Sequence, residues 1–383
     1  MQRSTASRFT SLTSAFGGMF AVAASIGIGR FIYTPILPPM IEALGLSKAN
    51  AGLIASANFT GYLCGALMAT VSRVPGSRRA WLLAALAMSA LTTGGMGLVV
   101  NMPGFLLLRF AGGVASALAL ILASALVLET LAALGRGSLA ALHFAGAGVG
   151  IIVSSGIIVV LQARGAAWPA LWFAGGLLSV LATLAVAALV ADRPGVVPAP
   201  NTGAAGKGGQ ALLAMAGAYG LFGFGYVITA TFIVAIVRGT PDIRPLEPMI
   251  WIVVGIAATP SVTLWSWLAR RFGIPTGFAV AAVVEALGVV ASVAWPSATG
   301  IFVAAILLGG TFMGLVALGM MRARELTTGD PRRAIALLTG AFGVGQIIGP
   351  LFAGALYDYF GNLSAASYAA AAALLAAAVL ARR

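Results

Sequence analysis

Charged residues are scarce in this sequence. Only 8% of its 383 residues are Asp, Glu, Lys or Arg, whereas 60% are hydrophobic and the mean hydropathy is +1.03. A soluble domain carries about 25% charged residues, so this chain has too few to cover a water-exposed surface. The composition therefore predicts an integral membrane protein.

Histidine, cysteine and acidic residues are also few. The chain has one histidine, one cysteine and nine Asp and Glu residues. A single cysteine, Cys64, excludes an intramolecular disulfide. No Cys/His pair, metal-ligand cluster or Ser/His/Asp arrangement is visible in the sequence, so we expect no metal, no cofactor and no enzyme activity. An enzyme would need ionisable groups such as Glu129 and His143 to converge with an arginine at a membrane face.

Long apolar runs take up nearly the whole chain. A membrane-spanning helix needs roughly 20 apolar residues, and twelve stretches meet this requirement. Their approximate limits are 12–38, 49–71, 80–100, 103–129, 139–161, 168–190, 211–237, 248–269, 275–294, 298–321, 334–357 and 362–381. The sequence thus predicts an all-α membrane protein with twelve transmembrane helices and no soluble domain.

The basic residues are distributed unevenly between the two sides of the predicted membrane. If the N-terminus is cytoplasmic, sixteen Lys and Arg residues fall on the inside and four on the outside, namely Lys48, Arg164, Arg238 and Arg244. Positive charge concentrates in cytoplasmic loops, which predicts cytoplasmic termini in a bacterial inner membrane. The sequence pI of about 11.2 therefore reflects orientation, and we expect no nucleic-acid partner.

The two halves of the chain share an internal repeat. Landmarks recur in order at offsets of 195 to 197 residues: Gly27–Ile32 with Gly223–Ile228, Arg73 and Gly76 with Arg270 and Gly273, Gly112–Gly113 with Gly309–Gly310, Glu129 with Glu325, and Gly148–Gly150 with Gly343–Gly345. An offset of six spans indicates parallel repeats. We predict two six-helix bundles, residues 1–191 and 211–383, related by a pseudo-two-fold axis and joined by a cytoplasmic linker over 192–210.

Several motifs resemble those of the major facilitator superfamily. The stretch Arg73–Arg79 is similar to the family's cytoplasmic loop between spans 2 and 3, and Arg109–Ala117 is similar to its fourth-span pattern. The stretches Gly29–Pro38 and Arg333–Thr339 look more specifically like the YbfB/YjiJ-type bacterial branch. The resemblance covers essentially the whole chain and implies this family's fold and a transport function.

Two arginines are predicted to lie at membrane depth, Arg30 in span 1 and Arg109 in span 4. A charge at this depth costs several kcal/mol and normally faces a cavity or a partner. In the family fold spans 1 and 4 line the central cavity, so the two guanidinium groups are candidates to bind a carboxylate or phosphate. The alternative is that they bind backbone carbonyls near the kinked end of span 1, where Pro35, Pro38 and Pro39 leave acceptors free.

Four uncharged residues are further candidates for substrate binding. Asn58 and Tyr62 are four residues apart and share one face of span 2. Tyr226 takes the repeat position of Arg30, and Gln346 is polar where its repeat partner Ile151 is apolar. The alternative for these residues is helix packing or interhelical hydrogen bonding.

Other residues are candidates for coupling and gating. Glu285 is the acid nearest the middle of a span and His143 is the only histidine, so either is a candidate proton carrier; packing is the alternative for both. Glu129 and Glu325 occupy equivalent cytoplasmic helix ends near basic loops that contain Arg73 and Arg270. These four residues are predicted to form salt bridges that close a cytoplasmic gate.

The sequence as a whole predicts a secondary transporter that works by alternating access in the lipid bilayer. A small organic anion is the preferred substrate, driven by protons or by its own gradient, and we expect a monomer. Efflux of lipophilic drug-like compounds is the alternative within transport, favoured if the arginines are structural. A membrane nutrient sensor that binds without transport is the alternative from another class.

Overall fold

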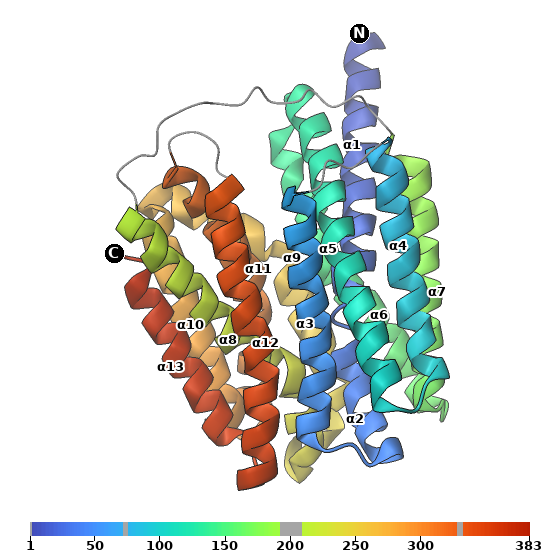
Figure 1. Cartoon of the computed structure of the whole chain (residues 1–383), viewed down its shortest axis with the longest axis vertical. Helices are drawn as coiled ribbons and strands as arrows, with labels where there is room; N and C mark the ends of the chain where they lie inside the picture. Colours follow the sequence, from blue (N-terminus) through green and yellow to red (C-terminus); the bar gives the residue numbers. More distant parts are fainter. Residues whose placement is uncertain (1, 72–75, 192–208, 328–331) are drawn as a thin grey trace.

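The computed structural model describes residues 2–71, 76–191, 209–327 and 332–383, and within these ranges every regular element is helical (Figure 1). The first half contains α1 (Gln2–Val22), a π-helical segment η1 (Ala23–Ile28), α2 (Tyr33–Leu44), α3 (Lys48–Val71), α4 (Arg78–Gly95), α5 (Met102–Ala133), α6 (Ala140–Ala163) and α7 (Trp168–Leu189). The second half contains α8 (Gly209–Gly239), α9 (Glu247–Phe272), α10 (Ile274–Ala294), α11 (Ala298–Glu325), α12 (Arg332–Phe360) and α13 (Ser364–Leu380). Most of the predicted linker, 192–208, lies outside the described residues.

The number of spans agrees with the prediction of twelve. In the described ranges, eleven helical segments are long and apolar enough to cross a membrane, with α1, η1 and α2 together forming the first, Thr10–Leu44. The twelfth, α13, is shorter at 17 residues, which is at the lower limit of about 17 for a spanning helix. The ends of the helices fall within a few residues of the predicted limits except where α1 extends to Gln2.

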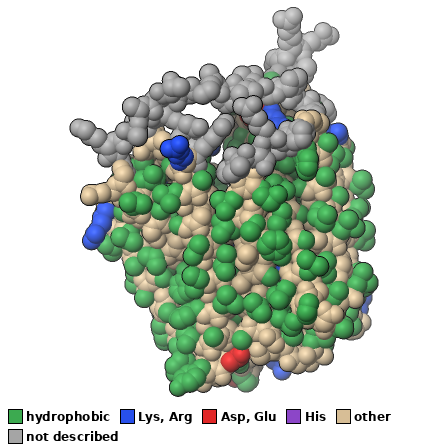
Figure 2. Space-filling view, viewed as in Figure 1, with side chains coloured by type: hydrophobic (Ala, Val, Ile, Leu, Met, Phe, Trp, Pro, Cys, Tyr) green, Lys and Arg blue, Asp and Glu red, His purple; other side chains and the backbone are tan. Residues whose placement is uncertain are grey.

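The surface of the molecule is suited to lipid. Hydrophobic side chains cover most of the face shown in Figure 2, and Lys and Arg side chains lie near its margins. Large apolar residues such as Leu91, Leu107 and Leu184 are more than 60% exposed along the helices. Because a lipid-facing surface needs no polar cover, this exposure is expected for a membrane protein and unusual for a soluble one.

The two six-helix bundles are joined by two equivalent interfaces. In one, α3 of the first bundle packs along α12 of the second, and in the other, α6 packs along α9. Gly148 lies against Thr259 in α9, whereas Gly343 lies against Leu63 in α3. These two contacts are repeats of one another, since Gly343 is offset from Gly148 by 195 residues and Thr259 from Leu63 by 196. The interfaces thus follow the predicted pseudo-two-fold axis.

The repeat also appears in the capping of helices. Asn101 caps α5 by accepting a 2.8 Å hydrogen bond from Gly104 N–H, and Ser297 caps α11 by accepting one of 3.2 Å from Gly300 N–H. Such caps satisfy the free N–H groups at a helix start. Because Asn101 and Ser297 are 196 residues apart, the same local device starts the fourth helix of each bundle.

Glycines allow helices to approach closely within the first bundle. A Cβ atom on Gly146 would overlap the carbonyl oxygen of Met19 in α1, whereas one on Gly156, in the same helix α6, would meet nothing within 4 Å. Backbone is harder to displace than a flexible side chain, so the two positions should respond differently to one added methyl group.

Gly146→Ala is therefore expected to destabilise the protein by about 1–3 kcal/mol, and Gly156→Ala to have little effect. The thermal unfolding midpoints of the two variants in detergent, compared with the wild type, measure the difference. Equal midpoints in both variants would show that α1 and α6 are not packed as closely as described.

Candidate functional site

The first span is interrupted at the point where Arg30 lies. The π-helical segment η1 ends at Ile28, residues Gly29–Ile32 form a turn, and α2 resumes at Tyr33. Pro35 has no N–H group, so the carbonyl of Phe31 lacks its usual helical donor four residues later and accepts from Thr34 N–H at 3.2 Å instead. Broken helices within membranes occur where protein or a cavity satisfies the freed backbone groups. The break therefore creates polar groups that the rest of the fold has to satisfy.

Both bundles supply donors to this break. Arg109 in α5 donates from Nη1 to the Gly29 carbonyl and from Nη2 to the Arg30 carbonyl, each at 3.3 Å. From the second bundle, Trp251 in α9 donates from Nε1 to the Phe31 carbonyl at 3.2 Å. The Arg109 guanidinium also lies over the Tyr33 ring, 5.0 Å from its centroid. Two roles were considered for Arg109, substrate contact and binding of backbone carbonyls. Its hydrogen bonds agree with the second.

Arg30 is placed differently from Arg109. Arg30 is only 6% exposed. Its guanidinium carbon lies 4.5 Å from the ring centroid of Tyr62, 4.6 Å from that of Phe59 and 5.6 Å from that of Phe31. Its buried Nε and Nη2 atoms have no hydrogen-bond partner, and no carboxylate among the described residues forms an ion pair with it. Rings cover the guanidinium while its Nε–Nη2 edge remains unpaired.

The break lies close to the pseudo-two-fold axis. Thr34 donates from Oγ1 to the Ala230 carbonyl at 2.8 Å, and these residues are 196 positions apart, so they are repeat equivalents. Residues that touch their own repeat partners lie near the symmetry axis. Arg30 is four residues before Thr34, and its repeat equivalent Tyr226 is four residues before Ala230. The two residues therefore lie on opposite sides of this axis, near the centre of the molecule.

Tyr226 belongs to a polar and aromatic cluster in the second bundle. Gln346 in α12 donates from Nε2 to the Tyr226 hydroxyl, and its Oε1 atom is buried without a partner. The Tyr226 ring is parallel to those of Phe312 and Phe342, at centroid separations of 5.9 and 5.8 Å. Phe31 of the first bundle packs edge-on against Phe312 at 5.5 Å, so the cluster continues across the interface to Arg30.

The predicted substrate-binding residues are thus brought together, with one partial exception. Arg30 lies over the Tyr62 ring, the rings of Phe31 and Phe312 connect it to Tyr226, and Gln346 is hydrogen-bonded to Tyr226. Asn58 donates from Nδ2 to the Arg109 carbonyl at 3.0 Å, so its amide bridges α3 and α5 within the first bundle. Its substrate role remains a prediction, as does that of Arg109.

The two coupling candidates are both buried but differ in their surroundings. Glu285 in α10 is fully buried and lies beside Thr311, whose hydroxyl donates instead to the Leu307 carbonyl, so neither carboxyl oxygen accepts a hydrogen bond. It also interacts electrostatically with Tyr226. His143 lies deep in the first bundle, where Nε2 is 3.0 Å from the Ser124 hydroxyl. Glu285 is therefore in the same bundle as Tyr226 and Gln346, whereas His143 is in the other bundle.

The gating candidates form salt bridges within bundles. Glu129 binds Arg78 with two hydrogen bonds, at 3.0 and 2.9 Å, and Glu325 binds Arg322 at 2.9 Å. Arg270 is exposed at the end of α9 without an ion pair among the described residues. Arg73 lies outside the described residues. The proposed gate between bundles remains a prediction.

Polar contacts between the bundles are present toward the opposite face, the end of the molecule away from the start of α1. Arg238 in α8 pairs with Glu42 of α2 at 3.1 Å and with Glu247 at 2.6 Å. The Ala49 N–H donates to Asp358 Oδ2 at 3.2 Å. Together with the Thr34 and Trp251 hydrogen bonds, the contacts of Glu42 and Asp358 join the two bundles between the depth of Arg30 and that face. The Arg238–Glu247 pair lies within the second bundle.

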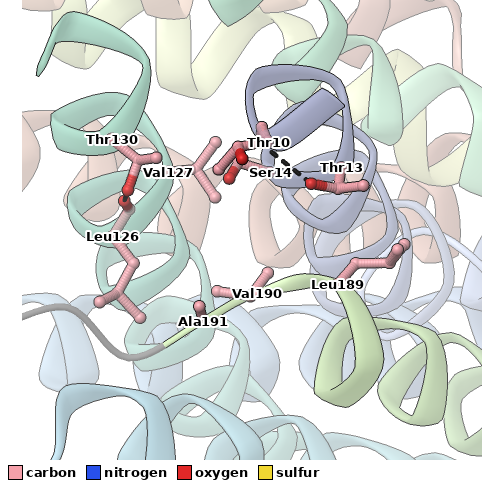
Figure 3. Close-up of a pocket in the computed structure, with 9 residues that line it drawn as sticks. All are labelled: Thr10, Thr13, Ser14, Leu126, Val127, Thr130, Leu189, Val190 and Ala191. Atoms are coloured by element: carbon pink, nitrogen blue, oxygen red, sulfur yellow. Dashed lines mark hydrogen bonds between the residues drawn. The ribbon is translucent and has the colours of Figure 1, made fainter. Parts of the chain in front are cut away.

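A small cavity lies elsewhere in the first bundle. It measures about 60 Å³ and is lined by Thr10, Thr13, Ser14, Leu126, Val127, Thr130, Leu189, Val190 and Ala191. Figure 3 shows its hydroxyl groups on the helices that carry Thr10–Ser14 and Thr130, with the chain past Leu189 closing one side. It includes none of the predicted site residues and lies near the N-terminal end of α1, so we do not assign substrate binding to it.

Sequence reasoning missed the aromatic contributors to the central site: Phe31, Phe59, Trp251, Phe312 and Phe342. The proline at position 35 was a usable signal for Phe31, because it removes the helical N–H that would bond the carbonyl four residues earlier. Nothing in the sequence identified Trp251 as its donor, since the contact joins residues 220 positions apart.

Solved structures of similar fold include membrane transporters. The nucleoside transporter NupG aligns as its D323A mutant with a TM-score of 0.76 and 15% identity, over 97% of this chain and 98% of that one. Another NupG structure aligns with a TM-score of 0.72 and 17% identity, over 97% of each chain. A bacterial homologue of the human lysosomal transporter Spinster, inward-facing and unoccupied, aligns with a TM-score of 0.65 and 14% identity, over 98% of this chain and 94% of that one. At these identities the likeness shows the fold alone.

The sequence itself identifies the family. No curated protein sequence matches the chain. Residues 22–382, however, match the family described as "Uncharacterised MFS-type transporter YbfB", which confirms the resemblance noted from Gly29–Pro38 and Arg333–Thr339. With its twelve predicted spans in two bundles, the chain belongs to this YbfB-type family of major facilitator superfamily transporters and is a multi-pass membrane transporter.

Proposed function

We propose that this transporter carries a small organic anion across the bacterial inner membrane by alternating access. One observation supports this substrate class above others: Arg30 is buried, has no acidic partner and leaves Nε and Nη2 unbonded. These two N–H groups point the same way along one edge of the guanidinium, which is the geometry that binds a carboxylate through two parallel hydrogen bonds. A bound anion would supply the missing counter-charge.

The arrangement of the bundles supports a mechanism. Arg30 belongs to the first bundle and Tyr226 to the second, on opposite sides of the pseudo-two-fold axis, so rocking of the bundles would change access to the space between them. The contacts made by Arg238, Ala49 and Trp251 hold the bundles together on the face that the basic-residue distribution places outside. We propose that Glu129, Arg270, Glu325 and Arg73 take part in closing the cytoplasmic side in the opposite state. We further propose a monomer with cytoplasmic termini.

Proton coupling through Glu285 is part of the proposal. An isolated buried carboxylate is costly, so this carboxyl would carry a proton while no cation is near it. A monoanion moved with one proton carries no net charge, so the pH gradient drives accumulation, about 1.4 kcal/mol or tenfold for each pH unit. His143 is the second candidate, and its neutral neighbour Ser124 gives it no link to Arg30.

Glu285→Gln is expected to abolish anion accumulation driven by a pH gradient while leaving anion exchange between the two sides intact, because the amide keeps the shape but cannot exchange a proton. Proteoliposomes with an imposed pH gradient measure the first and preloaded proteoliposomes the second. His143→Gln serves as the comparison. Normal accumulation in Glu285→Gln and its loss in His143→Gln would move the coupling site to His143.

Flux and binding together test the proposed function against its rivals. Purified protein in proteoliposomes should take up radiolabelled organic anions and should not transport lipophilic cations. Transport of lipophilic cations, with no uptake of organic anions, would support drug efflux and contradict the anion proposal. Anion binding without flux would support the nutrient-sensor alternative, provided that the orientation of the protein in the liposomes and the imposed gradients are both varied.

A further inference from the structure

The second bundle carries a polar pair whose hydrogen-bonding groups are not all used. Gln346 is fully buried and Tyr226 nearly so. One atom of the Gln346 amide bonds the Tyr226 hydroxyl, and the other has no partner. A buried amide oxygen without a donor is destabilising, and buried polar groups left in this way are rare in folded proteins.

The pair offers one donor and one acceptor whichever way the amide is turned. With Nε2 donating to the hydroxyl, the Tyr226 proton and the Gln346 Oε1 atom are both free. With the amide reversed, the hydroxyl donates to the oxygen, and the free groups are an amide N–H and a phenol lone pair. A hydroxyl or amide group on a ligand is complementary in both cases, because each can donate and accept.

This pair faces the arginine across the axis. Tyr226 occupies the repeat position of Arg30 in the other bundle. The rings of Phe31 and Phe312 connect the two ends: Phe31 lies 5.6 Å from the Arg30 guanidinium carbon, Phe312 stacks on Tyr226 at 5.9 Å, and the two rings are 5.5 Å apart. The site is therefore polar at two ends and apolar between them.

Resting on the anion-transport function proposed above, we propose that the substrate is a carboxylate with an apolar body and a neutral hydroxyl or amide at its far end. Arg30 of the first bundle binds the carboxylate, and Tyr226 and Gln346 of the second bundle bind the neutral group. Such a ligand contacts both bundles at once. Contact with both is what a substrate needs in order to favour the closed arrangement through which the bundles rock.

Matched ligand pairs test this assignment on the full-length protein. Benzoate is compared with 3- and 4-hydroxybenzoate, and hexanoate with 6-hydroxyhexanoate, by isothermal titration calorimetry in detergent. In the wild type the hydroxyl of at least one pair is expected to raise affinity about tenfold, the effect of one well-placed neutral hydrogen bond. In Gln346→Leu and Tyr226→Phe this gain should disappear, so that each hydroxylated ligand binds no better than its parent carboxylate to the same variant.

Ser367→Ala is the control, because Ser367 is another buried polar residue of the second bundle whose hydroxyl has no partner, and it should keep the full hydroxyl gain. Equal affinity of parent and hydroxylated ligands in the wild type would overturn the assignment yet leave the anion proposal standing if Arg30 variants lose binding. A gain that persists in both Gln346→Leu and Tyr226→Phe would also overturn it. If no carboxylate binds the wild type, the proposed function and this inference both fail.

Discussion

Replacing Arg30 with methionine is expected to abolish the binding of organic anions and, at the same time, to raise the thermal stability of the ligand-free protein. The reason for both effects is the same unpaired charge. Arg30 is 6% exposed, and its Nε and Nη2 atoms have no partner, so the empty protein carries the cost of a buried cation without the benefit of a bound anion. Methionine fills a similar volume without charge.

The two effects can be measured separately. Loss of a buried charge-assisted contact costs about 2–5 kcal/mol of binding, which corresponds to at least a roughly thirtyfold weaker affinity for carboxylates by calorimetry. The unfolding midpoint without ligand should rise. Arg30→Lys should bind anions with intermediate affinity, because an ammonium keeps the charge but lacks the parallel pair of N–H groups. A lower midpoint in Arg30→Met, with unchanged anion affinity, would show that Arg30 is structural.

Arg109→Met is expected to have the opposite effect on stability. The Arg109 guanidinium donates to the carbonyls of Gly29 and Arg30 at 3.3 Å each, and no helical N–H replaces it at the break. Two carbonyls left without donors in a buried site cost about 1–3 kcal/mol each. We therefore expect a markedly lower unfolding midpoint, the largest loss of stability among the substitutions considered.

Arg109 should also affect binding through Arg30, as a positioning residue. Without it, the turn at Gly29–Ile32 loses two of the bonds that fix its direction, so carboxylate affinity should fall even under conditions where the variant is fully folded. Arg109→Lys should recover part of the stability, and Arg164→Met, at an exposed arginine, should change neither quantity. Unchanged stability in Arg109→Met would contradict the described role of this residue.

Together the two arginines illustrate what the sequence could and could not predict. Both were identified from the sequence as charges at membrane depth, and both roles, substrate contact and carbonyl binding, were considered for each. In the structure their roles differ. Arg109 donates hydrogen bonds to two carbonyls, whereas the Nε and Nη2 atoms of Arg30 have no hydrogen-bond partner. The choice depended on where α5 lies relative to a break in the first span, which no local pattern specifies.

The role of Glu285 also depends on which helices lie beside it, and the sequence does not specify these neighbours. The sequence located it near the middle of a span, where both a proton site and packing were considered. Its contact with Thr311 of the neighbouring helix and its proximity to Tyr226 follow from the packing of α10 against α11 and α8. Hydropathy reports how deep a residue lies and not toward which helix it points.

The sequence by itself determined the membrane class, the twelve spans and the repeat, and its motifs identified the family. These features depend on local composition and on regular spacing, which a chain displays without being folded. Tertiary structure alone decided which polar groups meet: Trp251 with Phe31, Thr34 with Ala230, and Gln346 with Tyr226. In a membrane the lipid-facing and core-facing sides of a helix are both apolar, so the pattern that reveals the buried face of a soluble helix is absent, and only packing specifies the site.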